Sequence, residues 1–161
     1  MEAGLSLGSN LGDRQAALRE AVRRLTALPG TRLLEMAPLY ETDPVGARPE
    51  YAHLKYLNTV VILDVSPDLA ALSTAVHAIE DALGRRRTDD RNAPRVIDID
   101  ILYAGEITQS NGILDLPHPR WAQRRFVLQP LADVRPDLRL PGAAGSVAEL
   151  LAALPVGECV H

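Results

Sequence analysis

Residues 97–101 alternate apolar and acidic side chains in the order Ile-Asp-Ile-Asp-Ile. Successive side chains of a strand point to opposite faces of its sheet, so this pattern predicts a strand with its isoleucines toward a core and Asp98 and Asp100 on the other face. At ~3.3 Å of rise per residue the two aspartates are roughly 6.6 Å apart along the strand, which suits hard cations bridged by the oxygens of a ligand. A half-buried strand whose aspartates simply face water is the alternative interpretation.

Positive charge is concentrated just before this strand. Five arginines and two aspartates lie between residues 85 and 95, which gives this segment a net charge of +3 in a chain whose net charge is −4. Neighbouring arginines repel one another unless an anion relieves them. Guanidinium groups bind phosphate through paired hydrogen bonds, so arginines next to a cation-binding acid pair favour a polyphosphate ligand. The single lysine, Lys55, has no P-loop context, which excludes that class of nucleotide site.

The bulk composition is that of one globular domain over residues 1–161. The hydrophobic fraction is 47% and the mean hydropathy is −0.02, with no apolar run of membrane-spanning length and no signal-peptide pattern. The single cysteine, Cys159, has no partner for an internal disulfide, so we expect a cytoplasmic protein. A pI near 5.5 argues against a sequence-independent nucleic-acid binder, whose affinity depends on a broad basic face.

The periodicities predict alternating strands and helices. Strands are expected at Ala3–Ser9, Leu33–Thr42, Leu54–Val65 and Val96–Tyr103, and the second should pair with the third. Helices are expected from the Gly8–Asp13 turn to Pro29, from an N-cap at Ser66 to Gly84, and from a Ser146/Glu149 capping box to Leu154. Residues Trp121–Leu131 form a short amphipathic stretch. The Gly8–Asp13 turn either caps its helix or cradles a phosphate. The order β-α-β-β-α-β predicts an α+β sandwich: a ferredoxin-like core with additional strands and a C-terminal helix, in which one mostly antiparallel sheet is flanked by helices.

Four motifs in order carry a resemblance to a known family. They are Leu7-Gly8-Ser9-Asn10-Leu11-Gly12-Asp13; Tyr40 to Gly46 with Tyr56-Leu57-Asn58; Pro94 to Leu102; and Leu116-Pro117-His118-Pro119 with Arg124 to Leu128. With these motifs the chain resembles the 6-hydroxymethyl-7,8-dihydropterin pyrophosphokinases of folate biosynthesis over nearly its whole length. The resemblance implies transfer of the β,γ-pyrophosphoryl group of ATP to the hydroxymethyl oxygen of the pterin, with release of AMP.

The same resemblance implies the residues of the site. Two Mg²⁺ ions would lie between the nucleotide and Asp98 and Asp100, and no nucleophilic side chain is required. The implied residues are Arg85, Arg95, Asp98 and Asp100 for catalysis; Glu80, Arg85, Arg87, Arg91, Arg95, Ile101, His118 and Arg124 for ATP; and Thr42, Asp43, Pro44, Val45, Tyr56, Asn58 and Phe126 for the pterin. The implied partners are these two small molecules, with no nucleic acid and no membrane, and we expect a monomer.

Several of these residues have a structural alternative. Tyr56 and Phe126 could be plain core aromatics, Glu80 could be a helix-surface acid paired with neighbours one turn away, and His118 could cap or pack a turn. Two other function classes also fit: a non-catalytic ferredoxin-like module that binds RNA or a small anion, and a different metal-dependent phosphotransferase using the same acid pair. The first would need exposed aromatic residues on its strands, of which this chain has few; the second would not yield AMP together with a diphosphorylated acceptor.

Overall fold

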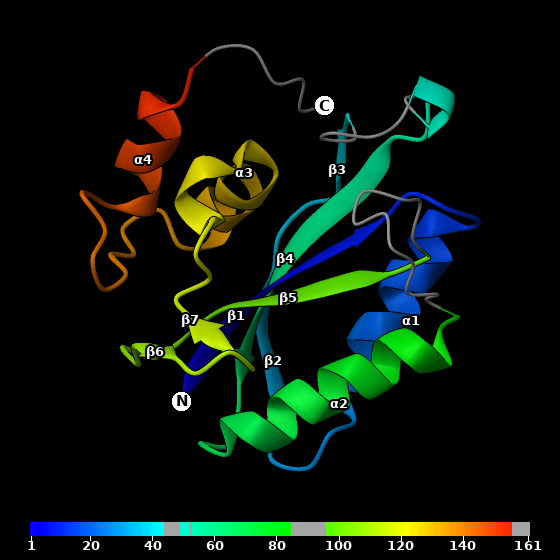
Figure 1. Ribbon diagram of the computed structural model, residues 1–161, viewed down its shortest axis with the longest axis horizontal. Helices are drawn as coiled ribbons and strands as arrows, with labels where there is room; N and C mark the ends of the chain where they lie inside the picture. The colour runs from blue at the N-terminus through cyan, green and yellow to red at the C-terminus, as the bar shows by residue number, and fades with distance from the viewer. Residues whose placement is uncertain (44–48, 52, 85–95, 156–161) are drawn as a thin grey trace.

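A five-stranded antiparallel sheet forms the centre of the computed structural model, which describes residues 1–43, 49–51, 53–84 and 96–155 (Figure 1). Its strands are β1 (Glu2–Ser9), β2 (Arg32–Met36), β3 (Tyr40–Thr42), β4 (Tyr56–Asp64) and β5 (Asp98–Ala104). The order is β2-β4-β1-β5, with β3 pairing with β4, and every pairing is antiparallel. This order confirms the predicted ferredoxin-like core.

Helices cover both faces of the sheet. Helices α1 (Arg14–Thr26) and α2 (Leu69–Ala82) lie on one face, and α3 (Arg125–Val134) and α4 (Val147–Ala153) lie on the other (Figure 1). Short 3₁₀ turns span Pro49–Tyr51 and Trp121–Gln123, and β6 (Gln109–Ser110) pairs with β7 (Asp115–Leu116) in a small separate sheet. Within the described ranges, no helix combines the length and the apolar character that crossing a membrane requires.

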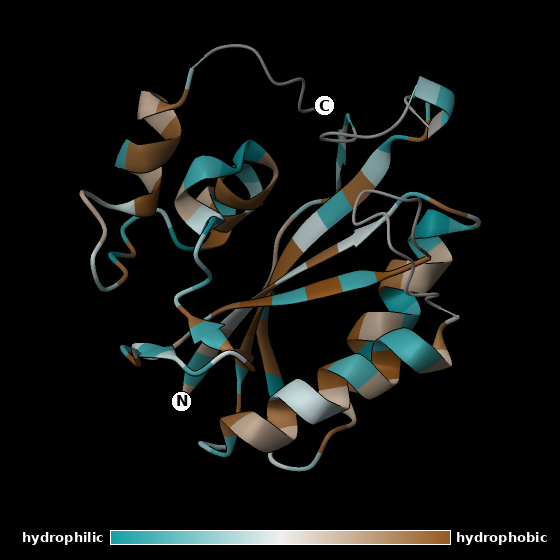
Figure 2. Cartoon of the chain, in the orientation of Figure 1, coloured by the Kyte–Doolittle hydropathy of each residue, from teal (hydrophilic) through white to brown (hydrophobic). Residues whose placement is uncertain are grey.

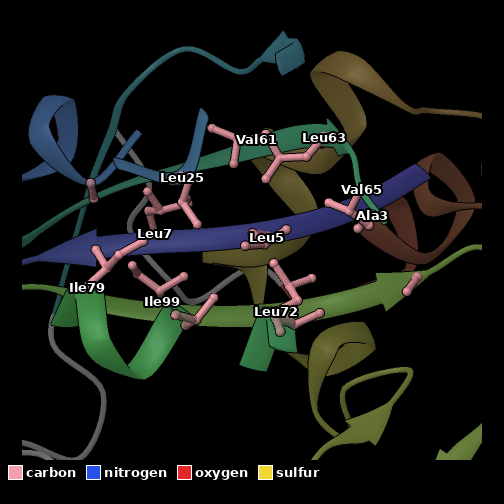
Figure 3. Packing of buried hydrophobic residues seen from close by; sticks show 14 of the residues in the cluster. Ala3, Leu5, Leu7, Leu25, Val61, Leu63, Val65, Leu72, Ile79 and Ile99 are labelled. Carbon is pink, nitrogen blue, oxygen red and sulfur yellow. The ribbon is translucent and has the colours of Figure 1, made fainter. Parts of the chain in front are cut away.

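Two apolar clusters fill the space between the sheet and its helices. The alternating residues Leu5 and Leu7 of β1 pack with Leu72 and Ile79 of α2 and with Ile99 of β5 (Figure 3). On the opposite face, Val60 and Ile62 of β4 pack with Leu128 and Leu131 of α3. Brown, apolar segments alternate with teal, hydrophilic ones along the strands and helices, as expected for elements with one face in the core (Figure 2). The central strand β1 is therefore buried along most of its length.

Local side-chain hydrogen bonds set the helix starts. Asp13 accepts a hydrogen bond from the Ala16 amide, so the cap interpretation of the Gly8–Asp13 turn is confirmed. The predicted capping box of Ser146 and Glu149 is also present. The N-cap of α2, in contrast, was wrongly predicted.

The N-cap of α2 is Asp68 rather than Ser66. The Asp68 carboxylate accepts from the Ala71 amide at 3.1 Å, and the Ser66 hydroxyl accepts from the Asp68 amide in the turn before the helix. Both residues are good capping types two positions apart, and the carboxylate closer to the apolar stripe takes the position.

The segment predicted as one strand over Leu33–Thr42 forms two strands, β2 and β3, which are separated at residues 37–39. The Ala37 amide still bonds to Val60, but the next residue, Pro38, has no amide hydrogen to donate. Both pieces pair with β4, so the predicted pairing with the following strand is confirmed. The interruption separates the outer edge strand from β3, which carries Thr42.

Gly4 provides a test of this packing, because it faces the ring of Tyr103. A Cβ at Gly4 would lie 2.3 Å from Tyr103 Cε1, and the ring is held by a 2.6 Å hydrogen bond from its hydroxyl to Glu2. We expect Gly4→Ala to lower the free energy of unfolding by about 1–3 kcal/mol in urea denaturation. Combining it with Tyr103→Leu should recover part of this loss, because the smaller side chain leaves room. Strictly additive effects would contradict the contact.

Candidate active site

The acid pair occupies the face of β5 opposite its isoleucines. Ile99 and Ile101 are at most 5% exposed and pack in the core, whereas Asp98 and Asp100 are half-buried. This confirms the predicted alternation. Asp98 pairs with Gly8 of β1, and Asp100 pairs with Ser6. The two carboxylates therefore lie next to the last residues of the central strand.

On the other side of β1, β4 and β3 present amide and hydroxyl groups. Asn58 of β4 pairs with the same Gly8, and its Nδ2 atom donates to Thr42 Oγ1 at 2.5 Å. Both side chains are buried, at 3% and 4% exposure, so this hydrogen bond fixes the orientation of the amide. Tyr56 lies two residues earlier on β4 and is partly buried.

Gly8 of β1 lies between these two groups of side chains, because it pairs with Asn58 on one side and with Asp98 on the other. A Cβ at this position would lie 2.6 Å from Asn58 Oδ1 and 3.3 Å from Tyr56 Cδ1, so a larger residue would displace the amide. Neighbouring strands are about 4.8 Å apart, which places the backbone of the acid pair roughly 9.6 Å from that of Asn58. The pairing register thus places carboxylates on one side of Gly8 and an amide on the other, and Gly8 itself adds no side chain between them.

Arg124 and Phe126 come to this surface from the start of α3. The Arg124 guanidinium lies 4.0 Å from the Asp100 carboxylate and 5.4 Å from the centre of the Phe126 ring. Phe126 is partly buried against the second apolar cluster, so the core interpretation holds for part of its surface. Its contact with Arg124 nevertheless brings an aromatic face next to the acid pair.

His118 has a defined hydrogen-bonding state. Its Nδ1 atom accepts a hydrogen bond from the Arg120 amide at 3.1 Å, so the neutral ring carries its proton on Nε2 and can donate it to an anion. Burial lowers the pKa of His118, and Arg124 and Arg120 lower it further, while Asp98 and Asp115 act in the opposite direction. Through Nδ1, His118 thus caps the turn at Arg120, as its structural alternative expected, while Nε2 is left for a ligand.

Three hydrogen bonds from the turn after β1 and the start of α1 hold the start of β4 and the neighbouring β3, and no local sequence pattern indicates them. Arg14 donates to the Lys55 carbonyl at 2.9 Å and to Glu41 at 3.0 Å, and Asn10 donates to the Leu54 carbonyl. These bonds span 27 to 44 residues along the chain, so no short-range pattern contains them. They attach the segment leading into Tyr56 to the turn after β1.

Two of the residues implied to bind the nucleotide, Glu80 and Ile101, are buried. Glu80 is 1% exposed, and its Oε2 atom accepts a hydrogen bond from the Ile99 amide, so the expected surface position is wrong, although His77 does lie one turn away beside its carboxylate. The Ile101 side chain packs in the core, and any contact with a ligand would come from its main chain.

Among the residues implied to bind the pterin, Asp43 is exposed, and Lys55 Nζ lies 3.8 Å from its carboxylate. The other implied residues lie outside the described part of the chain: Pro44, Val45, Arg85, Arg87, Arg91 and Arg95.

The acid pair has the donor chemistry of a hard-cation site. No group of three or more histidine, cysteine or carboxylate side chains is gathered for a metal within the ranges that the structure describes. A pair of carboxylates is nonetheless sufficient for Mg²⁺, which commonly keeps several waters and takes its remaining ligands from substrate phosphates. Asp98 and Asp100 therefore fit a cation that arrives with an anionic ligand.

The lowered pKa of His118 predicts a pH dependence of stability. Below its usual value of 6.5, the unfolded chain takes up the proton before the folded chain does, so the free energy of unfolding should fall as pH decreases through this window. His118→Asn keeps an acceptor for the Arg120 amide but does not titrate. In metal-free urea denaturation between about pH 5 and 7.5, we expect the wild type to lose stability more steeply than this variant. Parallel profiles would contradict the shift.

The comparisons with known proteins agree with this geometry. The family model described as 7,8-dihydro-6-hydroxymethylpterin-pyrophosphokinase matches residues 4–136. The chain is 41% identical over 151 residues to 2-amino-4-hydroxy-6-hydroxymethyldihydropteridine pyrophosphokinase of Pseudomonas aeruginosa, covering 94% of this chain and 90% of the relative. The protein of the same name from Methylorubrum extorquens is 41% identical over 152 residues, covering 94% and 92% of the two chains.

Solved structures support the fold. The crystal structure of Plasmodium falciparum HPPK-DHPS with pteroate superimposes with a TM-score of 0.70 at 16% sequence identity, covering 94% of this chain. This chain spans only 42% of that longer one, so the likeness concerns one part of it. The family match, whose span of residues 4–136 includes Asp98 and Asp100, and the two relatives confirm the resemblance. The chain belongs to the 7,8-dihydro-6-hydroxymethylpterin-pyrophosphokinase family.

Proposed function

We propose that the surface around Gly8 is the active site at which this chain carries out the reaction of its family. As a pyrophosphokinase, it transfers the β,γ-pyrophosphoryl group of ATP to 6-hydroxymethyl-7,8-dihydropterin in folate biosynthesis and is an ATP-dependent diphosphotransferase. The supporting observation is the register of β1, in which Gly8 pairs with Asn58 on one side and with Asp98 on the other. A pterin on one side and a triphosphate on the other would then be neighbours.

Asp98 and Asp100 are proposed to hold two Mg²⁺ ions together with the phosphate oxygens of ATP. When bound, the ions would supply neutralisation of the charge that develops as the pyrophosphoryl group moves. Transfer of this kind depends on in-line placement and on electrostatic stabilisation more than on covalent help from the protein. The two half-buried carboxylates of β5 would fix where the phosphates lie.

The nucleotide side is completed by positively charged and hydrogen-bonding groups. Arg124, next to Asp100, and His118, with its proton on Nε2, are proposed to contact phosphate oxygens. The main chain at Ile101 is proposed to lie near the base. We propose the same phosphate-binding role for four arginines outside the described residues, with Arg85 and Arg95 also assisting catalysis: Arg85, Arg87, Arg91 and Arg95.

The pterin side is proposed to lie over β4 and β3. A flat heterocycle with an amide edge needs an aromatic face and a few fixed donors and acceptors. Phe126 and Tyr56 can supply the faces, and the Asn58–Thr42 pair supplies an oriented amide. Asp43, Pro44 and Val45, which follow Thr42, are proposed to line the rim. A cytoplasmic monomer with one domain over residues 1–161 and with no nucleic-acid or membrane partner remains a prediction.

Removing one charge of the acid pair tests the metal role. We expect Asp98→Asn and Asp100→Asn each to reduce AMP formation by roughly 10²- to 10³-fold, because charge stabilisation in the transition state is lost. The assay combines ATP, Mg²⁺ and 6-hydroxymethyl-7,8-dihydropterin and detects AMP by chromatography, with circular dichroism to check folding. Asp137→Asn, at an exposed acid outside the site, is the control. Undiminished AMP formation by the variant with both substitutions would exclude the proposed role.

The aromatic face of Phe126 can be tested separately. Phe126→Leu keeps an apolar side chain against the second cluster but removes the ring. Aromatic stacking contributes about 0.5–1.5 kcal/mol, so the dissociation constant of the pterin should rise by up to about tenfold. Calorimetric titration in the presence of a non-hydrolysable ATP analogue measures this change. An unchanged dissociation constant would assign Phe126 to the core alone.

A further inference from the structure

A buried carboxylate from α2 reaches the outer edge of β5. Glu80 lies in the last turn of α2 and is 1% exposed, and its Oε2 atom accepts a hydrogen bond from the Ile99 amide at 3.0 Å. His77 Nδ1, one turn earlier on the same helix, lies 3.5 Å from the other carboxylate oxygen. The bond between Glu80 and Ile99 connects a helix to the strand that carries the acid pair.

The position of β5 in the sheet explains why this bond matters. In the described sheet β5 is the last strand, so amides on its outer side have no further strand to pair with. Ile99 is 5% exposed and its amide is shielded from water, so it requires an acceptor from elsewhere in the protein. Glu80 provides that acceptor through its Oε2 atom.

A second contact holds the same edge further along. The His118 amide donates to the Leu102 carbonyl at 2.8 Å, so the segment that carries His118 is attached to β5 on its outer side. Ile99 lies between Asp98 and Asp100, and Leu102 lies two residues beyond them. The backbone beneath the acid pair is therefore held by β1 on its inner side, and by Glu80 and the His118 segment on its outer side.

We propose that Glu80 is a positioning residue: through the Ile99 amide, its carboxylate fixes the backbone that sets the spacing of Asp98 and Asp100, and thereby sets the affinity for divalent cations. This inference rests on the proposed function, in which these two aspartates bind Mg²⁺. Phosphoryl-type transfer is sensitive to misplacement of about 1 Å, so a loosened β5 would lower turnover as well as cation affinity. In this proposal Glu80 acts on the acid pair through the backbone of β5 and not by direct contact with the nucleotide.

Two substitutions at Glu80 separate the effect of side-chain length from the effect of the carboxylate charge. Glu80→Gln loses the charge but keeps an oxygen at the same distance along the side chain for the Ile99 amide. Glu80→Asp keeps the charge but is shorter by one methylene, which withdraws the oxygen from the amide. Positioning predicts that Glu80→Gln stays within about threefold of the wild type, whereas Glu80→Asp raises the Mg²⁺ concentration for half-maximal activity by roughly tenfold and lowers kcat by roughly 10- to 100-fold.

Val76→Ala supplies the matched control. Val76 is one turn before Glu80 on α2, is 3% exposed and packs in the same cluster, so its truncation weakens the helix contact without removing an acceptor. We expect it to lower stability while leaving the Mg²⁺ midpoint unchanged. Amide hydrogen exchange of Ile99 gives an independent readout: its protection should fall by more than the loss of global stability in Glu80→Asp, but by no more than that loss in Glu80→Gln or Val76→Ala.

The outcomes separate the two proposals. If Glu80→Asp retains the wild-type Mg²⁺ midpoint and Ile99 protection, or if Glu80→Gln is as impaired as Glu80→Asp, positioning through the amide is wrong. Equal increases of the KM for ATP in both variants, with an unchanged Mg²⁺ midpoint, would instead indicate direct contact with the nucleotide and also overturn it. Failure of the proposed function would appear earlier, as a wild-type protein that forms no AMP with Mg²⁺, ATP and the pterin.

Discussion

The antiparallel pairing of β1 with both β4 and β5 is the constraint on which the rest of the structure depends. It places Gly8 directly between Asn58 and Asp98, residues that are 40 positions apart in the sequence. Because strand side chains alternate, one register decides at once which residues enter the core and which face the site. A shift of β5 by one residue would bury Asp98 and Asp100 and expose the isoleucines. The hydrophobic core and the acid pair therefore support the same register.

Charge is arranged around this frame at short range. Arg124 lies between the Asp100 carboxylate and the Phe126 ring, so one guanidinium connects the acidic and aromatic parts of the surface. The neutral tautomer of His118 is fixed by the Arg120 amide, and burial together with Arg124 and Arg120 lowers its pKa. Elsewhere, Arg135 binds Glu2 and Glu35 and so attaches the end of α3 to β1 and β2. These ion pairs of Arg135 lie at the end of the sheet opposite the acid pair.

Much of the fold could be predicted from the sequence because its signals are local. The Ile97–Ile101 alternation identified β5 and the orientation of its acids, and the apolar stripe of residues 69–83 identified α2. Predictions were wrong where two local signals competed, as at Ser66 and Asp68, or where a proline interrupted a strand pattern, as at Pro38. Contacts such as Arg14 with Lys55, or Glu80 with Ile99, depend on the tertiary arrangement and leave no local pattern. The candidate site residues come from a family resemblance. Asp98, Asn58 and Arg124 lie around the Gly8 surface, whereas Glu80 and the Ile101 side chain are buried elsewhere.

The central claim is that Asp98 and Asp100 hold the cations of a nucleotide next to the surface formed by Asn58 and Phe126. The most direct measurement is a crystal structure with Mn²⁺, a non-hydrolysable ATP analogue and 6-hydroxymethyl-7,8-dihydropterin, in which anomalous scattering locates the ions. The account predicts Mn²⁺ at both carboxylates, bridged to phosphate oxygens, with the pterin ring over β4. Ions and nucleotide bound elsewhere, with the two aspartates facing bulk solvent, would contradict it.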